Sequence, residues 1–317
     1  MINGKEFEYA LLHQFAEKLK NYSKLEIICN NTLNIAKNCF SNSDILSQQK
    51  YLLYASFAVN FLIDIEPRLS NGISTDDILQ LEILSDHHGK SGDVRDILIV
   101  RLLQQWQIGI SAKNNHTAVK HSRLSIKIDF GKQWLNLPVS QEYFKNIAPI
   151  FSELNSIRKE SNATKKWRDI GDYHTKIYLP VLNAFKNELQ ILYAKNPKKV
   201  TQNLVHYLIG KKDFYKIIKL KNKIKIEAYN FNGSLNLSAK NIQAKYIIPQ
   251  TKLPNKILNI NFKNNSKTTI IVTMNNDWIL SFRIHNASSK VEPSLKFDIK
   301  LLQAPKTLFT NILHIDS

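Results

Sequence analysis

Cysteine is scarce in this sequence, and its scarcity limits the metal chemistry that we expect. Only Cys29 and Cys39 occur among the 317 residues, and neither belongs to a Cys/His spacing of the zinc-finger kind. We therefore expect no structural zinc site. A chain with so few thiols fits a reduced, intracellular setting.

Long apolar runs are also missing. The N-terminus, Met1–Phe7, lacks the apolar stretch of a signal peptide. No segment free of charged residues is long enough to span a bilayer, which takes about 20 residues. We therefore expect a cytoplasmic protein with no membrane partner.

Acidic residues are few compared with basic ones. The formal net charge is +18 and the sequence pI is about 9.7. Residues 195–317 hold 21 Lys and Arg against 6 Asp and Glu, whereas residues 1–194 hold 23 against 20. Such an excess favours a polyanionic partner, of which nucleic acid is the commonest soluble one. The alternative is a basic protein from a Lys- and Asn-rich coding background.

Two neighbouring segments alternate apolar and polar residues as strands do. Along residues 94–100, the alternation places Asp96 as the lone carboxylate on an apolar face. Along residues 107–113, apolar residues line one face, while Ser111 and Lys113 lie on the other. If the two strands pair, Asp96 and Lys113 share one cleft.

That pairing would have a chemical consequence. Burying a carboxylate costs several kcal/mol unless a positive group meets it. An aspartate beside a lysine also supplies what a metal-dependent nuclease needs, namely an oxygen ligand for Mg²⁺ and a positive charge for the phosphate and the attacking water. The alternative is an ordinary buried Asp–Lys pair with no catalytic role.

Several motifs, taken in order, resemble the HaeIII family of type II restriction endonucleases. They are Gly92–Asp96 with Ile97, Ile108–Ser111 with Lys113, Asn114 and His116, Lys120–Ser125, and Asp129–Gly131 with Trp134. That family is similar to the PD-(D/E)xK nucleases. The resemblance implies Mg²⁺-dependent double-strand cleavage of DNA at the centre of the palindrome GGCC. It also implies a cognate DNA methyltransferase in the same restriction-modification system.

One position departs from the nuclease pattern. The second acid of the (D/E)xK triplet is replaced by Ser111, and a hydroxyl is a poorer Mg²⁺ ligand than a carboxylate. We expect Asp93, at the strand entrance, or Glu82, on a short helix over residues 75–84, to compensate; Glu82 could equally face solvent. The carbonyl of Ala112 is a natural further ligand. The expected catalytic residues are Asp96 and Lys113 first, then Glu82, Asp93 and Ser111.

A polar run follows the second strand. If residues 114–125 are helical from His116 onward, then His116, Lys120 and Arg123 share one face and could grip phosphates and base edges. The alternative is a solvated run of charges, but the resemblance favours DNA contact. His116 as a general base is a less favoured option. The DNA-binding candidates here are Asn114, His116, Lys120, His121 and Arg123.

The remainder of the chain, residues 211–317, consists of alternating or β-branched runs separated by turn residues. Lysines alternate along residues 219–225, and we expect them on one strand face. Like charges on one face are unfavourable unless an anion lies on it. This β-rich region is therefore expected to bind DNA, with Lys221, Lys223 and Arg283 as candidates.

These patterns predict an α+β fold with an α/β nuclease core. Apolar residues at helical spacing along 5–70 and 140–209 indicate helices around a PD-(D/E)xK-like mixed sheet, followed by the β-rich basic region. The expected domains are residues 1–210, with the catalytic core at 74–135, and residues 211–317.

The predicted function is that of a type II restriction endonuclease that uses Mg²⁺ and leaves 5′-phosphates. A homodimer would suit a palindrome, although one subunit can cut the two strands in turn. The alternative is a non-catalytic DNA-binding or regulatory protein with a degenerate nuclease core, which Ser111 favours. A DNA methyltransferase is disfavoured because the chain has no Gly-rich cofactor loop and no Asn-Pro-Pro or Pro-Cys motif.

Overall fold

The computed structural model describes residues 2–71, 76–85, 93–115, 118–240 and 242–315. The chain forms two compact units. The first unit comprises Met1–His116, Gly210–Lys252 and Thr307–Ser317, and the second comprises Thr117–Ile209 and Leu253–Lys306. Each unit has its own sheet: seven strands in the first, called the large sheet, and five in the second, called the small sheet. Within the described ranges, no helix has the length and apolar character needed to traverse a bilayer.

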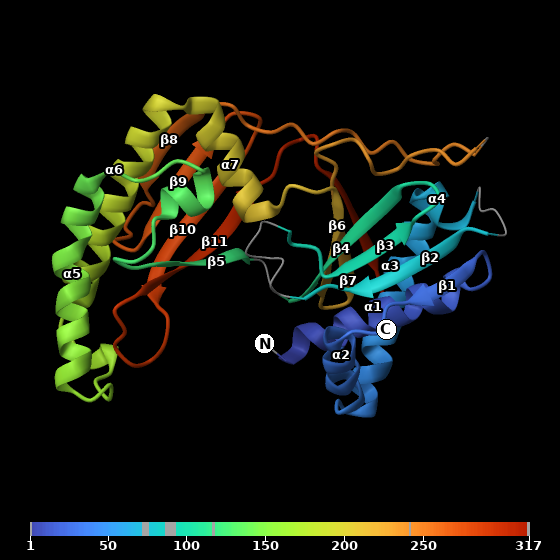
Figure 1. The fold of residues 1–317 in the computed structure, drawn as a ribbon, viewed down its shortest axis with the longest axis horizontal. Helices are drawn as coiled ribbons and strands as arrows, with labels where there is room; N and C mark the ends of the chain where they lie inside the picture. The colour runs from blue at the N-terminus through green and yellow to red at the C-terminus, as the bar shows by residue number, and fades with distance from the viewer. Residues whose placement is uncertain (1, 72–75, 86–92, 116–117, 241, 316–317) are drawn as a thin grey trace. The chain divides into compact units, whose positions relative to one another are not determined.

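The first unit combines helices with a mixed sheet (Figure 1). Its helices are α1 (Ile2–Leu19), α2 (Asn31–Ser41), α3 (Ile45–Ile65) and α4 (Pro67–Ser70). Its strands are β1 (Lys24–Ile27), β2 (Ile78–Ile83), β3 (Ile97–Arg101), β4 (Trp106–Asn114), β6 (Phe214–Leu220), β7 (Lys223–Tyr229) and β12 (Phe309–His314). They are ordered β1-β2-β3-β4-β6-β7-β12. The pairs β1/β2 and β4/β6 are parallel, and the other neighbouring pairs are antiparallel.

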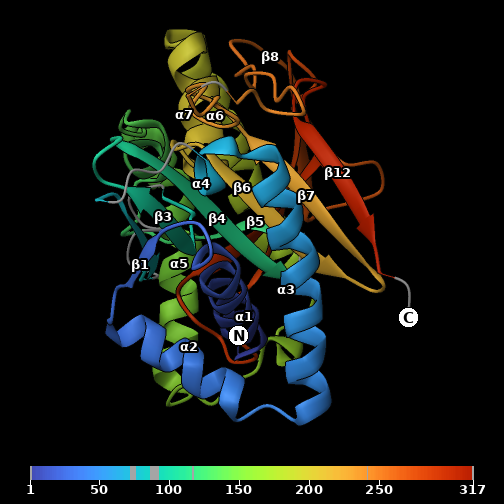
Figure 2. The same ribbon diagram turned by 90° about the vertical axis from the view of Figure 1, so that its right-hand side faces the viewer.

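Helices α1 and α3 lie on one face of the large sheet (Figure 2). Along β4, Ile108, Ile110 and Ala112 are buried in the core that these helices share with the sheet. Successive side chains of a strand point to opposite faces, so Ser111 and Lys113 point away from the helices. The alternation predicted for residues 107–113 is therefore confirmed.

The second unit places helices against an antiparallel sheet. Its helices are α5 (Gln141–Glu160), α6 (Leu179–Lys195) and α7 (Pro197–Ile209), with short helical turns at Gly131–Leu135, Trp167–Asp169 and His174–Tyr178. Its strands are β5 (Ala118–Leu124), β8 (Ile257–Phe262), β9 (Thr269–Met274), β10 (Ile279–Asn286) and β11 (Leu295–Gln303). They are ordered β5-β11-β10-β9-β8, and all neighbours are antiparallel.

Aromatic side chains hold the second unit together. Phe130, Trp134, Phe185 and Phe297 contact one another with ring centroids 4.7 to 6.2 Å apart. Offset and edge-on ring contacts of this kind add to the stabilisation from buried area. A Cβ on Gly131 would lie 2.4 Å from a backbone carbonyl oxygen, so this position requires glycine. The motif that begins at Asp129 therefore builds the core of this unit.

The mixed helices and sheets agree with the expected α+β class, but the compact units differ from the expected division at residue 210. Strand β6 pairs with β4, and β5 pairs with β11. Strands join a sheet through hydrogen bonds to neighbours that can lie far away in sequence. The β-rich C-terminal region is consequently shared between the two units instead of forming a domain of its own.

Two segments that we expected to be helical are strands. Residues 78–83 form β2, in which buried residues alternate with more exposed ones, and ladders with β1 and β3 hold it. Residues 118–124 form β5, held by β11. A period of two fits both segments, and strand pairing outweighs the helical spacing of single polar residues. His116 lies outside the described residues.

Candidate active site

Asp96 and Lys113 meet where β3 and β4 pair. Ile97 of β3 lies opposite Ile110 of β4. Asp96, the residue before β3, donates its backbone N–H to the carbonyl oxygen of Ile110 at 2.7 Å. Its Oδ2 atom lies 3.0 Å from Nζ of Lys113. The two side chains that the strand patterns placed in one cleft are thus in direct contact.

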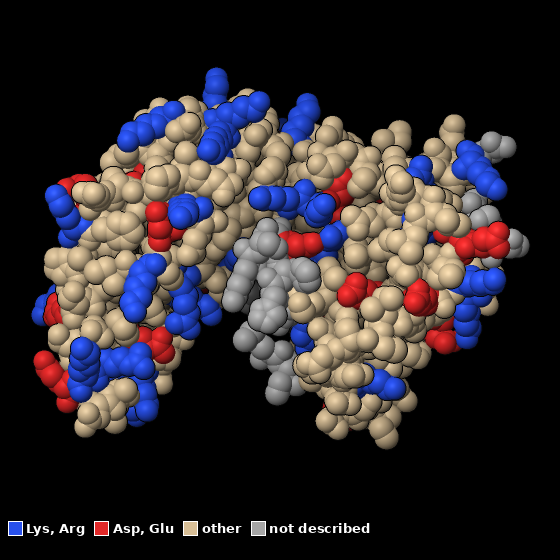
Figure 3. All heavy atoms as spheres, in the orientation of Figure 1, with Lys and Arg blue, Asp and Glu red and all other residues tan. Residues whose placement is uncertain are grey.

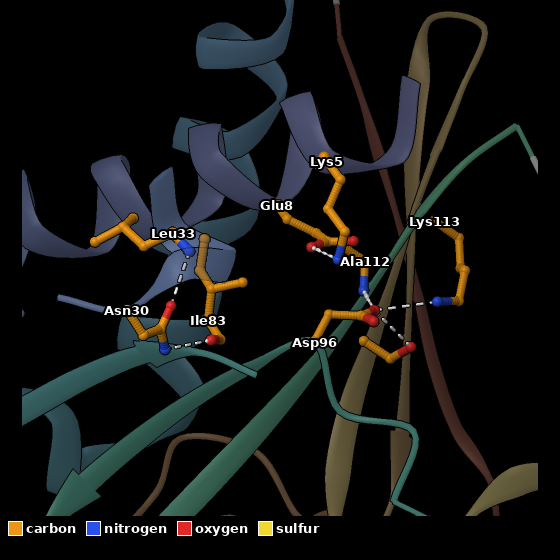
Figure 4. Close-up of polar contacts among 9 residues, drawn as sticks. Lys5, Glu8, Asn30, Leu33, Ile83, Asp96, Ala112 and Lys113 are labelled. Atoms are coloured by element: carbon orange, nitrogen blue, oxygen red, sulfur yellow. Dashed lines mark hydrogen bonds and ion pairs between the residues drawn. The ribbon is translucent and has the colours of Figure 1, made fainter. Parts of the chain in front are cut away.

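Three donors converge on Oδ2 of Asp96 (Figure 4). The backbone N–H of Ala112 donates at 2.7 Å, the hydroxyl of Ser111 at 3.2 Å and Nζ of Lys113 at 3.0 Å. The side chain of Asp96 is 18% exposed and that of Lys113 is 29% exposed. The carboxylate is therefore held in one orientation, while both charged groups remain reachable from solvent.

A second carboxylate, that of Glu8, lies at the same end of the β3–β4 pair. Its side chain extends from α1 toward Asp96 and Ala112 (Figure 4). Glu8 is only 6% exposed, and its Oε2 lies 2.9 Å from Nζ of Lys5. Burial, and after it the negative charge of Asp96, raise the pKa of Glu8 to about 7, although Lys5 opposes them. The negative charge of Asp96 disfavours ionisation of Glu8, and a bound cation would relieve this.

The motifs of the sequence did not single out Glu8, although the pattern of α1 contains a signal for it. Glu8, Leu12, Phe15 and Leu19 follow one another at helical spacing, and all four are buried. A carboxylate within the buried stripe of a helix costs free energy unless it is paired or has a role. Its neighbour Asp96 is far away along the chain, so only the fold brings the two acids together.

The oxygen ligands at this end of the β3–β4 pair fit a divalent cation such as Mg²⁺. Mg²⁺ uses one or two protein carboxylates and keeps several waters. Asp96 and Glu8 supply two carboxylates. Ala112 lies beyond the end of the β3–β4 ladder, and its backbone faces Asp96. In the part of the chain that the structure describes, no group of three or more His, Cys, Asp or Glu could hold a metal ion. A metal site completed by water and phosphate oxygens agrees with the presence of two carboxylates and with the lack of a larger ligand group among the described residues.

Asp93, one of the two acids expected to compensate for Ser111, is engaged elsewhere. Its carboxylate accepts two hydrogen bonds from the guanidinium of Arg95, at 2.8 and 2.7 Å. The Arg95 side chain lies directly over Gly109, where a Cβ would come within 1.9 Å of its Cδ. This bidentate pair favours a structural role for Asp93 beside the site.

Glu82, the other expected acid, lies on strand β2 and not on a helix. Its Oε1 accepts a hydrogen bond from Nδ2 of Asn30 at 3.3 Å. Asn30 caps the N-terminus of α2. The contact therefore holds Glu82 on β2, which lies on the other side of β3 from β4. These contacts favour Glu8 over Glu82 as the second acid of the site.

A further lysine lies next to the site on β6. The strand register places Lys216 beside Ser111 and Glu227 of β7 beside Lys216. Lys216 is 8% exposed; burial lowers its pKa, Glu227 opposes this, and the positive charge of Lys113 lowers it further. The two lysines therefore add their positive potentials on the face of the sheet away from the helices.

Asn114, a DNA-binding candidate of the first unit, belongs to a polar network at the end of β4. Its Nδ2 donates to the hydroxyl of Tyr51 at 3.1 Å, and its Oδ1 accepts from Nζ of Lys219 at 3.3 Å. The hydroxyl of Tyr51 in turn donates to Glu6 at 3.3 Å. These contacts hold the Asn114 amide between α3 and β6.

The lysines of residues 219–225 do not share one strand face, contrary to the expectation. Strands β6 and β7 form a hairpin, and the chain turns at Lys221 and Asn222; the φ angle of Asn222 is 53°. Lys219 lies over tyrosine rings of α3. Lys223 begins β7 beyond the turn. A turn reverses the chain and breaks the alternation that a single strand would have kept.

The candidates on β5 divide between two faces because β5 is a strand. Lys120 points into the second unit, where its Nζ donates to the carbonyl oxygen of Tyr207 at 2.9 Å and lies 3.7 Å from the centroid of that ring. Burial lowers the pKa of Lys120 to about 8. His121 and Arg123 lie on the opposite face, as does Arg283 of β10.

Comparison with known proteins supports the resemblance noted in the motifs. Residues 4–305 match the profile of the family described as HaeIII restriction endonuclease. The type II restriction enzyme HaeIII of Haemophilus aegyptius is 41% identical over 308 residues, which cover 96% of this chain and 95% of that protein. No solved structure matches the chain. The chain therefore belongs to the HaeIII restriction endonuclease family and is a type II site-specific endonuclease.

Proposed function

We propose that this endonuclease makes double-strand cuts at a short palindrome, GGCC with a central cut, and that it uses Mg²⁺ and leaves 5′-phosphates. One observation carries the catalytic assignment: Oδ2 of Asp96 lies 3.0 Å from Nζ of Lys113, and both side chains are partly exposed where the pairing of β3 and β4 ends. The burial of Glu8 beside Asp96 supports the same assignment. The proposed sequence and cut position rest on the family resemblance.

Asp96, Glu8 and the carbonyl of Ala112 would hold the divalent cation. When bound, such an ion neutralises charge on the scissile phosphate and lowers the pKa of a coordinated water. Hydrogen bonds from Ser111 and from the Ala112 N–H fix the orientation of Asp96. Lys5 holds the Glu8 carboxylate at 2.9 Å. The chain therefore preorganises its oxygen ligands before the substrate arrives.

Lys113 acts on the water and on the phosphate. Its Nζ is partly exposed and close to the metal ligand Asp96, so it can orient the attacking water and assist its deprotonation. Its positive charge also stabilises negative charge that develops on the phosphate oxygens. In-line attack on phosphorus breaks the bond to the 3′ oxygen and leaves the phosphate on the 5′ end.

Digestion of mapped plasmid DNA, followed by sequencing of the fragment ends, tests this proposal. We expect blunt ends within GGCC, loss of cutting in EDTA and recovery with Mg²⁺. Asp96→Ala should abolish cutting and Lys113→Ala should slow it strongly, whereas Glu82→Gln serves as the matched acid control and should cut normally. Full activity of Asp96→Ala would refute the proposed active site, whereas cuts at another sequence would refute only the proposed GGCC specificity.

The rival proposal is a DNA-binding protein with a degenerate nuclease core, which Ser111 favours. In this fold the Ser111 hydroxyl donates to Asp96, and Glu8 offers the carboxylate that the triplet lacks. The hydrogen bond and the nearby buried carboxylate support catalysis over the rival. A gel shift that depends on salt, without cleavage in either Mg²⁺ or Mn²⁺, would favour the rival instead.

The system partner that we propose is a cognate DNA methyltransferase that modifies the same palindrome. A symmetric sequence is matched by two-fold symmetry of the protein, so we also propose a homodimer on DNA. Sedimentation of the enzyme with and without a duplex carrying one site tests this. A monomeric complex that nicks one strand and then the other would contradict the dimer but not the nuclease site.

A further inference from the structure

The small sheet has one face that α6 and α7 cover and one that they leave open. The covered face carries buried aromatic residues such as Phe282 and Phe297, and the helices contact β5, β8 and β9. Residues that alternate with these point the other way. Seven charged or titratable residues of β5, β10 and β11 define what we call the open face: His121, Arg123, Arg283, His285, Lys296, Asp298 and Lys300.

The strand register aligns these residues in rows. Arg123 lies directly opposite Lys296. In the next row, Asp298 lies between His121 on one side and Arg283 on the other. The side chains of Arg123 and Arg283 are 54% and 58% exposed. The basic groups therefore form a continuous surface across three adjacent strands.

The open face carries more positive charge than its own acids balance. Asp298 is 3.8 Å from His121 and 3.5 Å from Arg283, and Glu292, just before β11, is 3.3 Å from Arg123. Like charges placed directly opposite on neighbouring strands, as Arg123 and Lys296 are, destabilise a sheet unless an anion lies over them. An anionic ligand would remove this cost.

Two further observations agree with an anionic ligand. Burial lowers the pKa of His285 on the same face, and the charges of Arg283 and Lys296 lower it further, which reflects a positive potential there. In sequence, the second unit holds 23 Lys and Arg against 10 Asp and Glu, whereas the first unit holds 21 against 16. Most of the excess charge of the chain therefore belongs to the second unit.

A pocket of about 280 Å³ opens beside Arg283 within the second unit. Tyr173, His174, Thr268 and His285 contribute to its lining. It thus combines a guanidinium, two imidazoles and hydroxyl groups, which are the donors that bind phosphate oxygens. The pocket gives the open face a concave point of attachment.

We propose that the open face is the surface that binds the DNA duplex, with phosphates over Arg123, Arg283 and Lys300 and one phosphate group at the pocket beside Arg283. This inference deepens the proposed function by naming the surface that holds its substrate. Phosphate contacts fix the register of a protein on DNA and supply most of its salt-dependent affinity.

The test compares two triple variants of the full chain that remove equal charge. The first is Arg123→Ala with Arg283→Ala and Lys300→Ala. The second is Lys195→Ala with Lys198→Ala and Lys199→Ala, three exposed lysines where α6 meets α7 on the helical layer, a region where basic side chains gather in Figure 3. Fluorescence anisotropy with a labelled duplex in EDTA measures binding without cleavage, so a failed cleavage mechanism cannot affect the result.

We expect the open-face triple to weaken binding by roughly 10- to 100-fold and to lower the slope of log K against log salt by about 3, near one per lost phosphate contact. The helical-layer triple should leave both quantities close to those of the wild type. Equal losses in the two triples would show an effect of net charge alone and overturn the proposal, as would a larger loss in the helical-layer triple. If thermal melting shows that the open-face triple is unfolded, the single variants Arg123→Ala and Arg283→Ala replace it.

Discussion

The two units of this endonuclease use charge in different ways. The first places two carboxylates, Glu8 and Asp96, near Lys113 where the pairing of the interior strands β3 and β4 ends. The second spreads arginine and lysine over the open face of the small sheet, with Asp298 between them. Metal-dependent hydrolysis needs buried oxygen ligands at short distances, whereas binding a polyanion needs an exposed excess of cations. Strand alternation exposes the cations of the open face, whereas the first unit adds a carboxylate from helix α1.

The units also differ in how their helices are used. Helix α1 of the first unit contributes both core residues, such as Phe15, and the acid Glu8. The helices of the second unit contribute an aromatic core, in which Phe185 contacts Phe297 at 4.9 Å between ring centroids. Helix α6 buries a carboxylate as well, that of Glu188, which accepts two hydrogen bonds from Ser140, whereas Glu8 of α1 lies near the second carboxylate, Asp96.

The strongest test of this division removes Lys113, the lysine that we propose to be catalytic. Lys113→Ala should lower the cleavage rate by roughly 10²- to 10⁴-fold, because a positioned proton-transfer group contributes that much. Duplex binding in EDTA should be unchanged, because binding is assigned to the second unit. Quenched-flow cleavage and anisotropy measure the two quantities, and Lys24→Ala, on the edge strand β1, is the matched control. Parallel losses of binding and cleavage would break the division.

Replacing Glu8, the proposed second acid, should have a smaller effect on cleavage. Glu8→Gln should raise the Mg²⁺ concentration needed for half-maximal cleavage by roughly 10- to 100-fold, the range seen when groups that support a metal site are removed. The matched variant Glu82→Gln should leave the Mg²⁺ dependence unchanged, because Glu82 contacts Asn30. Mg²⁺ titrations of cleavage distinguish the two. A larger shift for Glu82→Gln would reverse our choice of acid.

The hairpin lysines sharpen the comparison of DNA-binding surfaces. Lys221→Ala combined with Lys223→Ala should weaken duplex binding less than the open-face triple does, because the turn at Asn222 prevents a continuous basic row. Anisotropy over a range of salt concentrations gives both affinity and salt slope. A salt slope reduced as strongly as in the open-face triple would place the main DNA contacts on the first unit.

The smallest effect concerns the interior of the second unit. The pKa of Lys120 is lowered to about 8 by burial, while the unfolded lysine keeps its proton up to about 10.4. Between these values the unfolded state binds more protons, so the penalty for burying Lys120 decreases as pH rises. Lys120→Met should therefore gain stability at pH 7 relative to the wild type, and that gain should shrink toward pH 10. Urea unfolding at several pH values measures it; a gain independent of pH would contradict the lowered pKa.

Local patterns in the sequence were sufficient for part of this structure. The alternation along residues 107–113 and the ordered motifs led to the contact between Asp96 and Lys113, and helical spacing located α5, α6 and α7. These features depend on residues that are neighbours along the chain. Periodicity reports such neighbours directly because it reflects which side of an element is buried.

Other features required the tertiary structure. Glu82 lies on a strand because β1 and β3 pair with β2, and Lys120 points inward because β11 pairs with β5. Glu8 meets Asp96 only because α1 lies across the large sheet. Composition and short-range pattern determined the excess of positive charge, helices α5, α6 and α7, and the contact between Asp96 and Lys113. Which distant acid joins that pair, and which face of the small sheet is left open, depended on hydrogen-bonded ladders and helix packing between segments that no local period connects.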